Sequence, residues 1–275
     1  SDVAVFASPA SGELLALFAD HIVQGRVVFP GAAYLEMARA ACGGSGALLR
    51  RVFFLQPLLL DGDVRSLRVV CELNAPDERF EVRSEREEDG TGTAHCGGSF
   101  GATATHDERR RPQPAAVREE CAASACTSSL YSAFRSIGLE YGPCYRTLVA
   151  AWAAREAGLA IGLLRRRTRR QGTFVHPADL DGALQLTAML ASSSAAETRL
   201  PFSVGEAALW SVAGRAWPVV ERQGANATGV ALVCNGTRGD GGARLAGFET
   251  RALKAGAARP AATRPSYLYV TAWQA

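Results

Sequence analysis

The chain has 275 residues, of which 48% are hydrophobic, so it is long enough for one large domain or two moderate ones with a substantial core. Its formal net charge is +3, which is too small to indicate a nucleic-acid-binding protein. The sequence has no apolar run of about eighteen residues, so we expect no membrane-spanning helix.

The seven cysteines show no metal-binding spacing. Their odd number and the lack of a basic, apolar signal peptide favour reduced thiols and a cytoplasmic location. Because the sequence does not begin with methionine, we expect it to be part of a longer polypeptide.

Residues 1–108 are expected to form an α+β unit. A short strand, VAVFA, opens the chain, and the stretch from Asp20 to Ala41 follows it. Pro30 suits the start of a helix, because its missing N–H needs no partner there. Apolar residues then recur at three- and four-residue spacing, which predicts a helix. Strand-like runs follow it.

His21 lies in the approach to this predicted helix, and Gly31 lies at its start. A helix N-terminus carries free N–H groups and the positive end of the helix dipole. A histidine base beside a group that can hold developing negative charge is suited to removing a proton next to a carbonyl. The alternative interpretation is that His21 is a structural histidine.

Residues 109–125 are interpreted as a linker between the first unit and a second unit of residues 126–275. The segment is charged, contains Pro112 and Pro114, and has no apolar period. Arg109–Arg111 could instead be a docking patch.

The second unit repeats the first in outline: a short amphipathic piece, strands, a helix beginning near Pro177, and further strands. Asp181 and Gln185 are four residues apart, so their side chains are neighbours on one helix face. An acidic residue in the first turn normally complements the helix dipole, but Asp181 could instead point into a cleft. The basic run Arg165–Arg170 is interpreted as a solvated loop, with a landing site for an acidic partner as the alternative.

Four short motifs, in order, resemble those of the dehydratase domain of modular polyketide synthases and its relative in animal-type fatty acid synthase. The matches are His21, Gly25 and Pro30 to HxxxGxxxxP; Tyr141, Gly142 and Pro143 to YGPxF; Asp181 and Gln185 to DxxxQ; and Leu200, Pro201 and Phe202 to LPF. His95 falls in what resembles the family's HxxG strand. The resemblance spans nearly the whole chain and implies a double-hotdog fold, in which each of two long helices is wrapped by an antiparallel sheet.

The resemblance implies the dehydration of a 3-hydroxyacyl thioester on an acyl carrier protein to the 2,3-enoyl thioester. His21 would remove the C2 proton, and Asp181 would protonate the departing C3 hydroxyl. The remaining site residues are then substrate-binding or supporting: Gly31, Tyr141, Gln185, Pro30 and Gly25. Among these, the Gly31 N–H would hold the thioester carbonyl, Gln185 would hold Asp181, and Tyr141 would contact the leaving hydroxyl.

No metal or redox cofactor is implied; the substrate arrives on the phosphopantetheine of the carrier protein. The expected partners are that carrier protein, neighbouring domains of the same synthase and a second copy of the chain, with no nucleic acid and no membrane. For Asp181 to act as an acid, burial must raise its carboxyl pKa above the usual value of about 3.9. His21 must stay neutral to act as the base.

The sequence departs from the family pattern at two places. Tyr145 stands where YGPxF has phenylalanine, and Thr93 and Ala94 stand where a tryptophan often precedes the HxxG strand. His95 and His176 are expected to be structural, and Cys144 is not expected to be a nucleophile.

Three alternative functions remain open from the sequence. One is a domain that isomerises the double bond or cyclises the chain, and another is a product-template-like domain that directs ring closure. The third is a catalytically silent module that docks the carrier protein.

Overall fold

The computed structural model describes residues 2–43, 47–62, 64–86, 92–101, 112–191, 197–235 and 241–253. Within these ranges the strands form a sheet of twelve and a sheet of three, and the paired strands are antiparallel. Helices cover the large sheet, so the predicted α+β class is confirmed.

The first five strands of the large sheet come from the N-terminal part of the chain. In sheet order they are β1 (Val3–Pro9), β5 (Leu67–Asn74), β6 (Arg79–Arg86), β7 (Gly92–Gly101) and β4 (Leu48–Phe54). Alternation of buried and exposed residues along β6 shows why it forms here, since one face of the strand meets the core and the other meets water.

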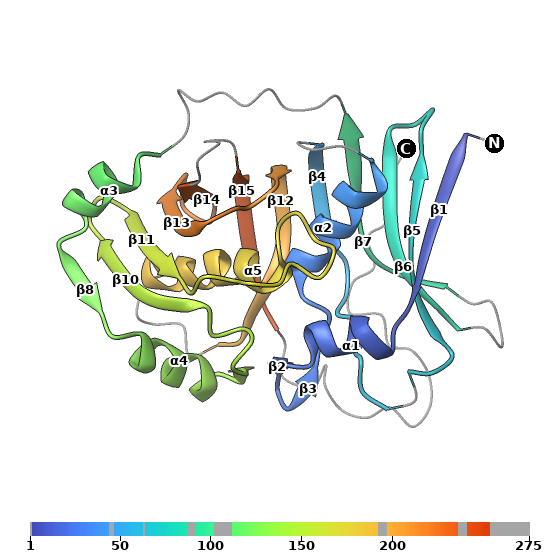
Figure 1. Cartoon of the computed structure of the whole chain (residues 1–275), viewed down its shortest axis with the longest axis horizontal. Coiled ribbons are helices and arrows are strands. Elements are labelled where there is room, and N and C mark those ends of the chain that lie inside the picture. Colours follow the sequence, from blue (N-terminus) through green and yellow to red (C-terminus); the bar gives the residue numbers. More distant parts are fainter. Residues whose placement is uncertain are drawn as a thin grey trace.

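The other seven strands come from the C-terminal part. In sheet order they are β12 (Arg199–Trp210), β15 (Gly242–Ala252), β14 (Thr228–Asn235), β13 (Arg215–Arg222), β11 (Leu159–Leu164), β10 (Leu148–Ala154) and β8 (Ala123–Ala125). β12 pairs with β4, so the two sets form one continuous sheet (Figure 1).

Two buried helices lie at the centre of the molecule and pack against each other (Figure 1). They are α2 (Gly31–Ala41), which contacts the N-terminal strands, and α5 (Pro177–Gln185), which contacts the C-terminal strands. The 3-10 helix η2 (Leu186–Met189) continues α5. All nine residues of α5 are buried, so this helix is enclosed on every side.

The remaining helices are shorter or more exposed: α1 (Gly12–Phe18), α3 (Pro114–Glu120) and α4 (Thr127–Ser136). No helix within the described ranges combines the length and the apolar character needed to cross a membrane.

The small sheet joins the two parts of the chain a second time. It consists of β3 (Arg26–Val27), β2 (His21–Val23) and β9 (Leu139–Tyr141), and β2 pairs with both neighbours. Gln24 and Gly25, which connect β2 to β3, both have positive φ, as a tight hairpin turn requires. The small sheet places His21 directly opposite Tyr141.

The segment predicted to be a linker is partly folded. Its described residues form α3 and β8, and β8 pairs with β10 at the edge of the large sheet. Pro114 lies in the first turn of α3, where a proline is tolerated. The sequence shows no apolar period here because the residues of the segment that pack inward, Val117, the fully buried Cys121 and Ala125, are few and widely spaced. Arg109–Arg111 and residues 254–275 lie outside the described residues, and the boundaries 1–108, 109–125 and 126–275 stay a prediction.

A buried ion pair ties α2 to the segment that precedes α5. The Arg39 guanidinium donates to both carboxylate oxygens of Glu36, at 2.8 and 3.0 Å. Glu36 Oε1 also accepts from the Phe174 N–H at 2.7 Å, and the Arg39 guanidinium lies 4.0 Å from the centre of the Phe174 ring. Glu36 therefore fixes the entry to α5 from the other part of the chain.

We predict that Glu36→Leu lowers the free energy of unfolding by about 3–5 kcal/mol, because it removes the carboxylate that compensates the buried Arg39 charge. Glu36→Leu combined with Arg39→Met should cost clearly less, since no unpaired charge then remains. Urea unfolding of the wild type, the single variant and the double variant measures both effects. Equal losses in the two variants would show that the pair is not what holds this segment.

Candidate active site

A cavity of about 1070 Å³ lies between the two parts of the chain. Five of the residues predicted from sequence line it: His21, Gly31, Tyr141, Asp181 and Gln185. Most of the remaining wall is apolar, and the described surface includes the following further side chains: Val28, Phe29, Tyr34, Phe54, Leu130, Leu139, Leu184, Leu200 and Phe202.

The His21 side chain is buried, and one hydrogen bond fixes its ring. Nδ1 lies 2.8 Å from the carbonyl oxygen of Val28. A carbonyl can only accept, so Nδ1 carries the proton and Nε2 keeps its lone pair. Nε2 lies 3.8 Å from Oδ1 of Asp181. The ring is therefore held in the tautomer that presents a base toward the carboxyl group.

The Asp181 side chain is buried and comes from the middle of α5; the acidic residue of the first turn is Asp179, so the expectation that Asp181 lies in the first turn is wrong. Burial raises the pKa of this carboxyl, while His21 and the hydrogen bond from Gln185 act in the opposite direction. The residue directly after Asp181 is Gly182. A side chain is excluded there, because a Cβ on Gly182 would collide with the closely packed Thr147 hydroxyl. Removal from water thus favours the protonated form of Asp181.

Gln185 lies one turn after Asp181 and connects it to Tyr131, a residue that was not predicted from the sequence. Gln185 Nε2 donates to Asp181 Oδ2 at 2.8 Å and to the Tyr145 carbonyl at 3.1 Å. The Tyr131 hydroxyl donates to Gln185 Oε1 at 3.1 Å. The only sequence signal for Tyr131 was its place on the amphipathic piece that opens the second unit.

The start of α2 faces the cavity at Gly31. Pro30 caps the helix with an extended backbone and is buried, but it is not part of the cavity wall. A Cβ at Gly31 would lie 3.0 Å from Cγ of Pro201 on β12. The glycine therefore lets the first turn of α2 come close to the LPF stretch.

The turn after β9 is fastened to the residue that precedes His21. The Asp20 carboxylate accepts from the Cys144 N–H at 2.7 Å, and the Asp20 carbonyl accepts from the Gly142 N–H at 2.8 Å. A Cβ at Gly142 would collide with the Asp20 side chain. The YGP turn is thus held against β2.

Tyr145 departs from the family pattern without gaining a contact for its hydroxyl. The residue is fully buried, its ring centre lies 5.2 Å from that of His21, and its hydroxyl has no hydrogen-bond partner in the described residues. It packs beside His21 and is not part of the cavity wall.

Four other residues singled out in the sequence lie away from the cavity wall. Gly25 is in the β2–β3 turn, where its N–H donates to Glu140. His95 lies between Ser84 and the Gln56 carbonyl, and burial lowers its pKa to about 4.

His176 caps α5 by accepting from the Ala178 N–H, and burial lowers its pKa to about 3. Cys144 is exposed, and the Asp20 carboxylate raises the pKa of its thiol. These contacts fit structural roles for both histidines and give Cys144 no activating base.

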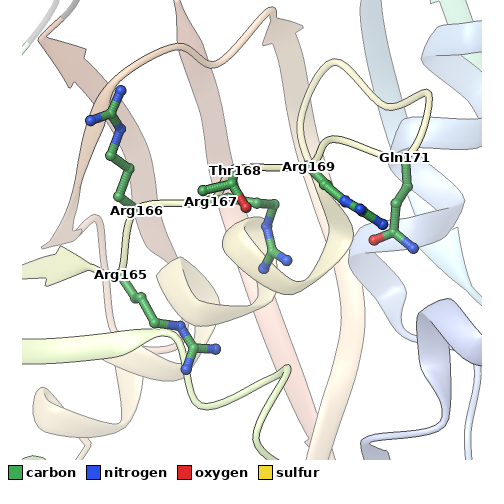
Figure 2. Close-up of a pocket in the computed structure, with 6 residues that line it drawn as sticks. All are labelled: Arg165, Arg166, Arg167, Thr168, Arg169 and Gln171. Atoms are coloured by element: carbon green, nitrogen blue, oxygen red, sulfur yellow. The ribbon is translucent and has the colours of Figure 1, made fainter.

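The basic run Arg165–Arg170 crosses the face of α5 (Figure 2). Arg167 points toward α5, where it pairs with both carboxylate oxygens of Asp179 at 2.8 and 2.9 Å. Arg165 donates to the Pro143 carbonyl and Arg170 to the Ser211 hydroxyl. Three of these arginines therefore hold the loop to its surroundings.

A search of the described residues finds no group of three histidine, cysteine, aspartate or glutamate side chains placed to hold a metal ion. Asp181 and His21 lie next to each other in the cavity wall, where burial favours the protonated carboxyl group and the Val28 carbonyl fixes the Nδ1 proton of the ring.

Comparison with known families gives two matches along the chain. Residues 1–85 match the family described as "Polyketide synthase dehydratase domain", and residues 109–260 match "Polyketide synthase dehydratase N-terminal domain".

Similar curated proteins are large synthases. The polyketide synthase ThaG of Burkholderia thailandensis is 30% identical over 256 residues, which are 87% of this chain and 4% of ThaG. The spectinabilin polyketide synthase system protein NorA′ of Streptomyces orinoci is 32% identical over 270 residues, or 92% of this chain and 7% of that protein. The chain thus spans only a small part of these relatives.

Solved structures show the same fold. The dehydratase domain from the CurF module of curacin polyketide synthase is 23% identical, covers 92% of this chain and 94% of its own, and superposes with a TM-score of 0.81. A dehydratase structure from work on the borrelidin and fluvirucin polyketide synthases is 25% identical. The match covers 92% of this chain and 90% of that chain, with a TM-score of 0.73. The predicted double-hotdog fold is confirmed.

Two exposed cysteines offer a probe of this region. Cys126 lines the cavity, and hydrogen bonds from Ser128 and Ser129 lower the pKa of its thiol to about 6. We predict that iodoacetamide labels Cys126 at least about tenfold faster than Cys144 near neutral pH, because the thiolate is the nucleophile. The Cys126 rate should rise with pH up to about 6 and level off above it, whereas the Cys144 rate should still be rising beyond the ordinary thiol pKa.

Peptide mass spectrometry of timed samples measures both rates in one experiment. Ser128→Ala should slow labelling of Cys126 near pH 6 and leave Cys144 unchanged. Equal rates at the two thiols would contradict the assignment.

Proposed function

We propose, because this chain belongs to the polyketide synthase dehydratase family, that it removes water from a 3-hydroxyacyl thioester carried on an acyl carrier protein. The product is the 2,3-enoyl thioester of a growing polyketide chain. The observation that carries the proposal is the 3.8 Å approach of His21 Nε2 to Asp181 Oδ1 inside a cavity with largely apolar walls.

His21 is the base in this proposal. Its Nδ1 proton is held by the Val28 carbonyl, so the lone pair on Nε2 is free to take the C2 proton of the substrate. Negative charge then builds on the thioester carbonyl oxygen. Gly31 lines the cavity at the start of α2, and in this proposal its N–H stabilises that charge.

Asp181 is the acid. Burial raises its pKa, so the carboxyl group holds a proton that it transfers to the C3 hydroxyl as the C3–O bond breaks. The electron pair left at C2 forms the C2–C3 double bond, and water departs. Gln185 holds Asp181, and Tyr141 lines the cavity where it can contact the leaving hydroxyl. These proton transfers need no metal or redox cofactor.

The relatives support the substrate class. ThaG and NorA′ are polyketide synthases of which this chain matches a small part, so we infer neighbouring domains in the same polypeptide and a carrier protein as substrate donor. Two solved structures of the CurK dehydratase, which is 21% identical to this chain, are of inactive mutants. In one a histidine is replaced by phenylalanine, and in the other an aspartate is replaced by asparagine. Dependence on one histidine and one aspartate agrees with the pair proposed here.

We also infer a cytoplasmic location, because all seven cysteines are free thiols. A second copy of the chain is proposed to pair at strand β1. This strand is at the edge of the large sheet and exposes Val3, Val5 and Phe6, with 56% of Val5 accessible. Exposed edge strands with apolar side chains are ready to pair with another chain.

We predict that Phe6→Glu shifts the protein from dimer to monomer, because the charge would be buried at the interface. Val149→Glu, at an equally exposed valine on β10, is the control and should leave the mass unchanged. Light scattering coupled to gel filtration measures both. A dimer that persists in Phe6→Glu would place the interface elsewhere.

We predict that His21→Ala and Asp181→Asn each lower the dehydration rate by about 10²–10⁴-fold, since each removes one proton-transfer group. The substrate is a 3-hydroxyacyl chain on a carrier protein or a pantetheine stub, and mass spectrometry follows the loss of water. Asp61→Asn, at a half-exposed carboxylate paired with Arg26 outside the cavity, is the matched control.

A folded wild-type protein that removes no water from either C3 enantiomer would contradict dehydration. A moved double bond or a closed ring in the product would then favour the isomerising or cyclising alternatives. Carrier-protein binding with no chemistry would favour the docking module.

A further inference from the structure

A chain of three hydrogen bonds runs from a backbone amide to the proposed acid, and a fourth branches from it to the Tyr145 carbonyl. The Leu148 N–H donates to the Tyr131 hydroxyl oxygen at 3.2 Å, and that hydroxyl donates to Gln185 Oε1 at 3.1 Å. Gln185 Nε2 then donates to Asp181 Oδ2 and to the Tyr145 carbonyl. Tyr131 stands at the head of this chain and is not part of the cavity wall.

The direction of every bond is fixed by groups that have only one role. A backbone N–H can only donate, so the Tyr131 oxygen accepts from Leu148 and its own proton must point to Gln185. A backbone carbonyl can only accept, so the Tyr145 carbonyl independently requires an N–H from Gln185. The Gln185 amide therefore cannot flip without losing hydrogen bonds at both ends.

The fixed amide decides which oxygen of Asp181 can carry a proton. Oδ2 receives an N–H from Gln185, so a proton on Oδ2 would meet a second donor. Oδ1 faces His21 Nε2 and the cavity. We propose that Tyr131 is a positioning residue that, through Gln185, confines the acid proton of Asp181 to Oδ1, the oxygen that faces the substrate.

This inference rests on the proposed function for its catalytic meaning, but the placement of the proton can be tested without turnover. The titratable groups around Asp181 come from three elements and the turn after β9: His21, Tyr131, Tyr141 and Tyr145. Burial raises the pKa of Tyr131 to about 12 and also raises the pKa values of Tyr141 and Tyr145. These three hydroxyls therefore keep their protons near neutral pH and do not contribute to a titration followed there.

The test is an infrared pH titration of the protonated carboxyl band of Asp181, assigned by its disappearance in Asp181→Asn. The Gln185 N–H lowers the pKa of Asp181. In Tyr131→Phe the amide is released, this hydrogen bond weakens, and the titration midpoint should move to higher pH. The phenylalanine ring keeps the packing against Phe134 and Tyr141. Ser132→Ala, an exposed hydroxyl on the same helix, is the control and should leave the midpoint unchanged.

A double-variant comparison separates action through Gln185 from a general loosening of α4. Tyr131→Phe should move the midpoint in the wild-type background and have no further effect in Gln185→Ala. In an assay with a substrate that the wild type dehydrates, Tyr131→Phe should lower kcat about tenfold and leave KM unchanged. The high-pH limb of the pH–rate profile should move to higher pH.

An unchanged midpoint in folded Tyr131→Phe would overturn the proposal, as would an equal shift in both backgrounds. If the midpoint moves but the wild type removes no water from any substrate, the positioning role stands and the proposed function fails. The two conclusions are thereby tested separately.

Discussion

Burial of one carboxyl group is the constraint on which the rest of this site depends. An aspartate is normally ionised near neutral pH, because the usual pKa of its carboxyl group is about 3.9. Asp181 is instead enclosed on a helix without an exposed residue, and loss of water around it outweighs the opposing effects of His21 and Gln185. The small Gly182 beside it allows this enclosure, since Thr147 occupies the space that a side chain would need.

The partner of that carboxyl comes from the other part of the chain, so the site exists only where the two parts meet. Strand β2 carries His21 and pairs with β9 of the second part. Asp20 fastens the turn after β9, and Glu36 holds the segment that leads into α5. These contacts fix two side chains, 160 residues apart in the sequence (181 − 21), at 3.8 Å. Neither part alone holds both side chains.

Much of this arrangement could be predicted from the sequence, and the exceptions share a physical cause. The helices α2 and α5 follow from apolar spacing and from Pro30 and Pro177, and the motif order led to His21 and Asp181. Tyr131 was invisible because it meets Gln185, 54 positions away, only through tertiary folding.

The remaining differences have the same origin. Gly25 belongs to a recognised motif, yet it shapes the β2–β3 turn and lies outside the cavity wall, because a motif records spacing and not direction. In the segment expected to be a linker, α3 and β8 gain their order by packing on and pairing with the C-terminal strands. The sequence pattern of the segment itself carries no sign of those contacts.

The continuous sheet has a consequence for access. β4 pairs with β12 along one seam and β2 pairs with β9 along another, so opening the molecule like a clamshell would break two hydrogen-bonded ladders at once. Elements that join the wall without a ladder are not tied to either seam. Helix α4 is such an element: it lines the cavity through Leu130 and Ala133 while most of its surface faces water. A shift of α4 would leave both ladders intact, whereas separation of the two parts of the chain would break them.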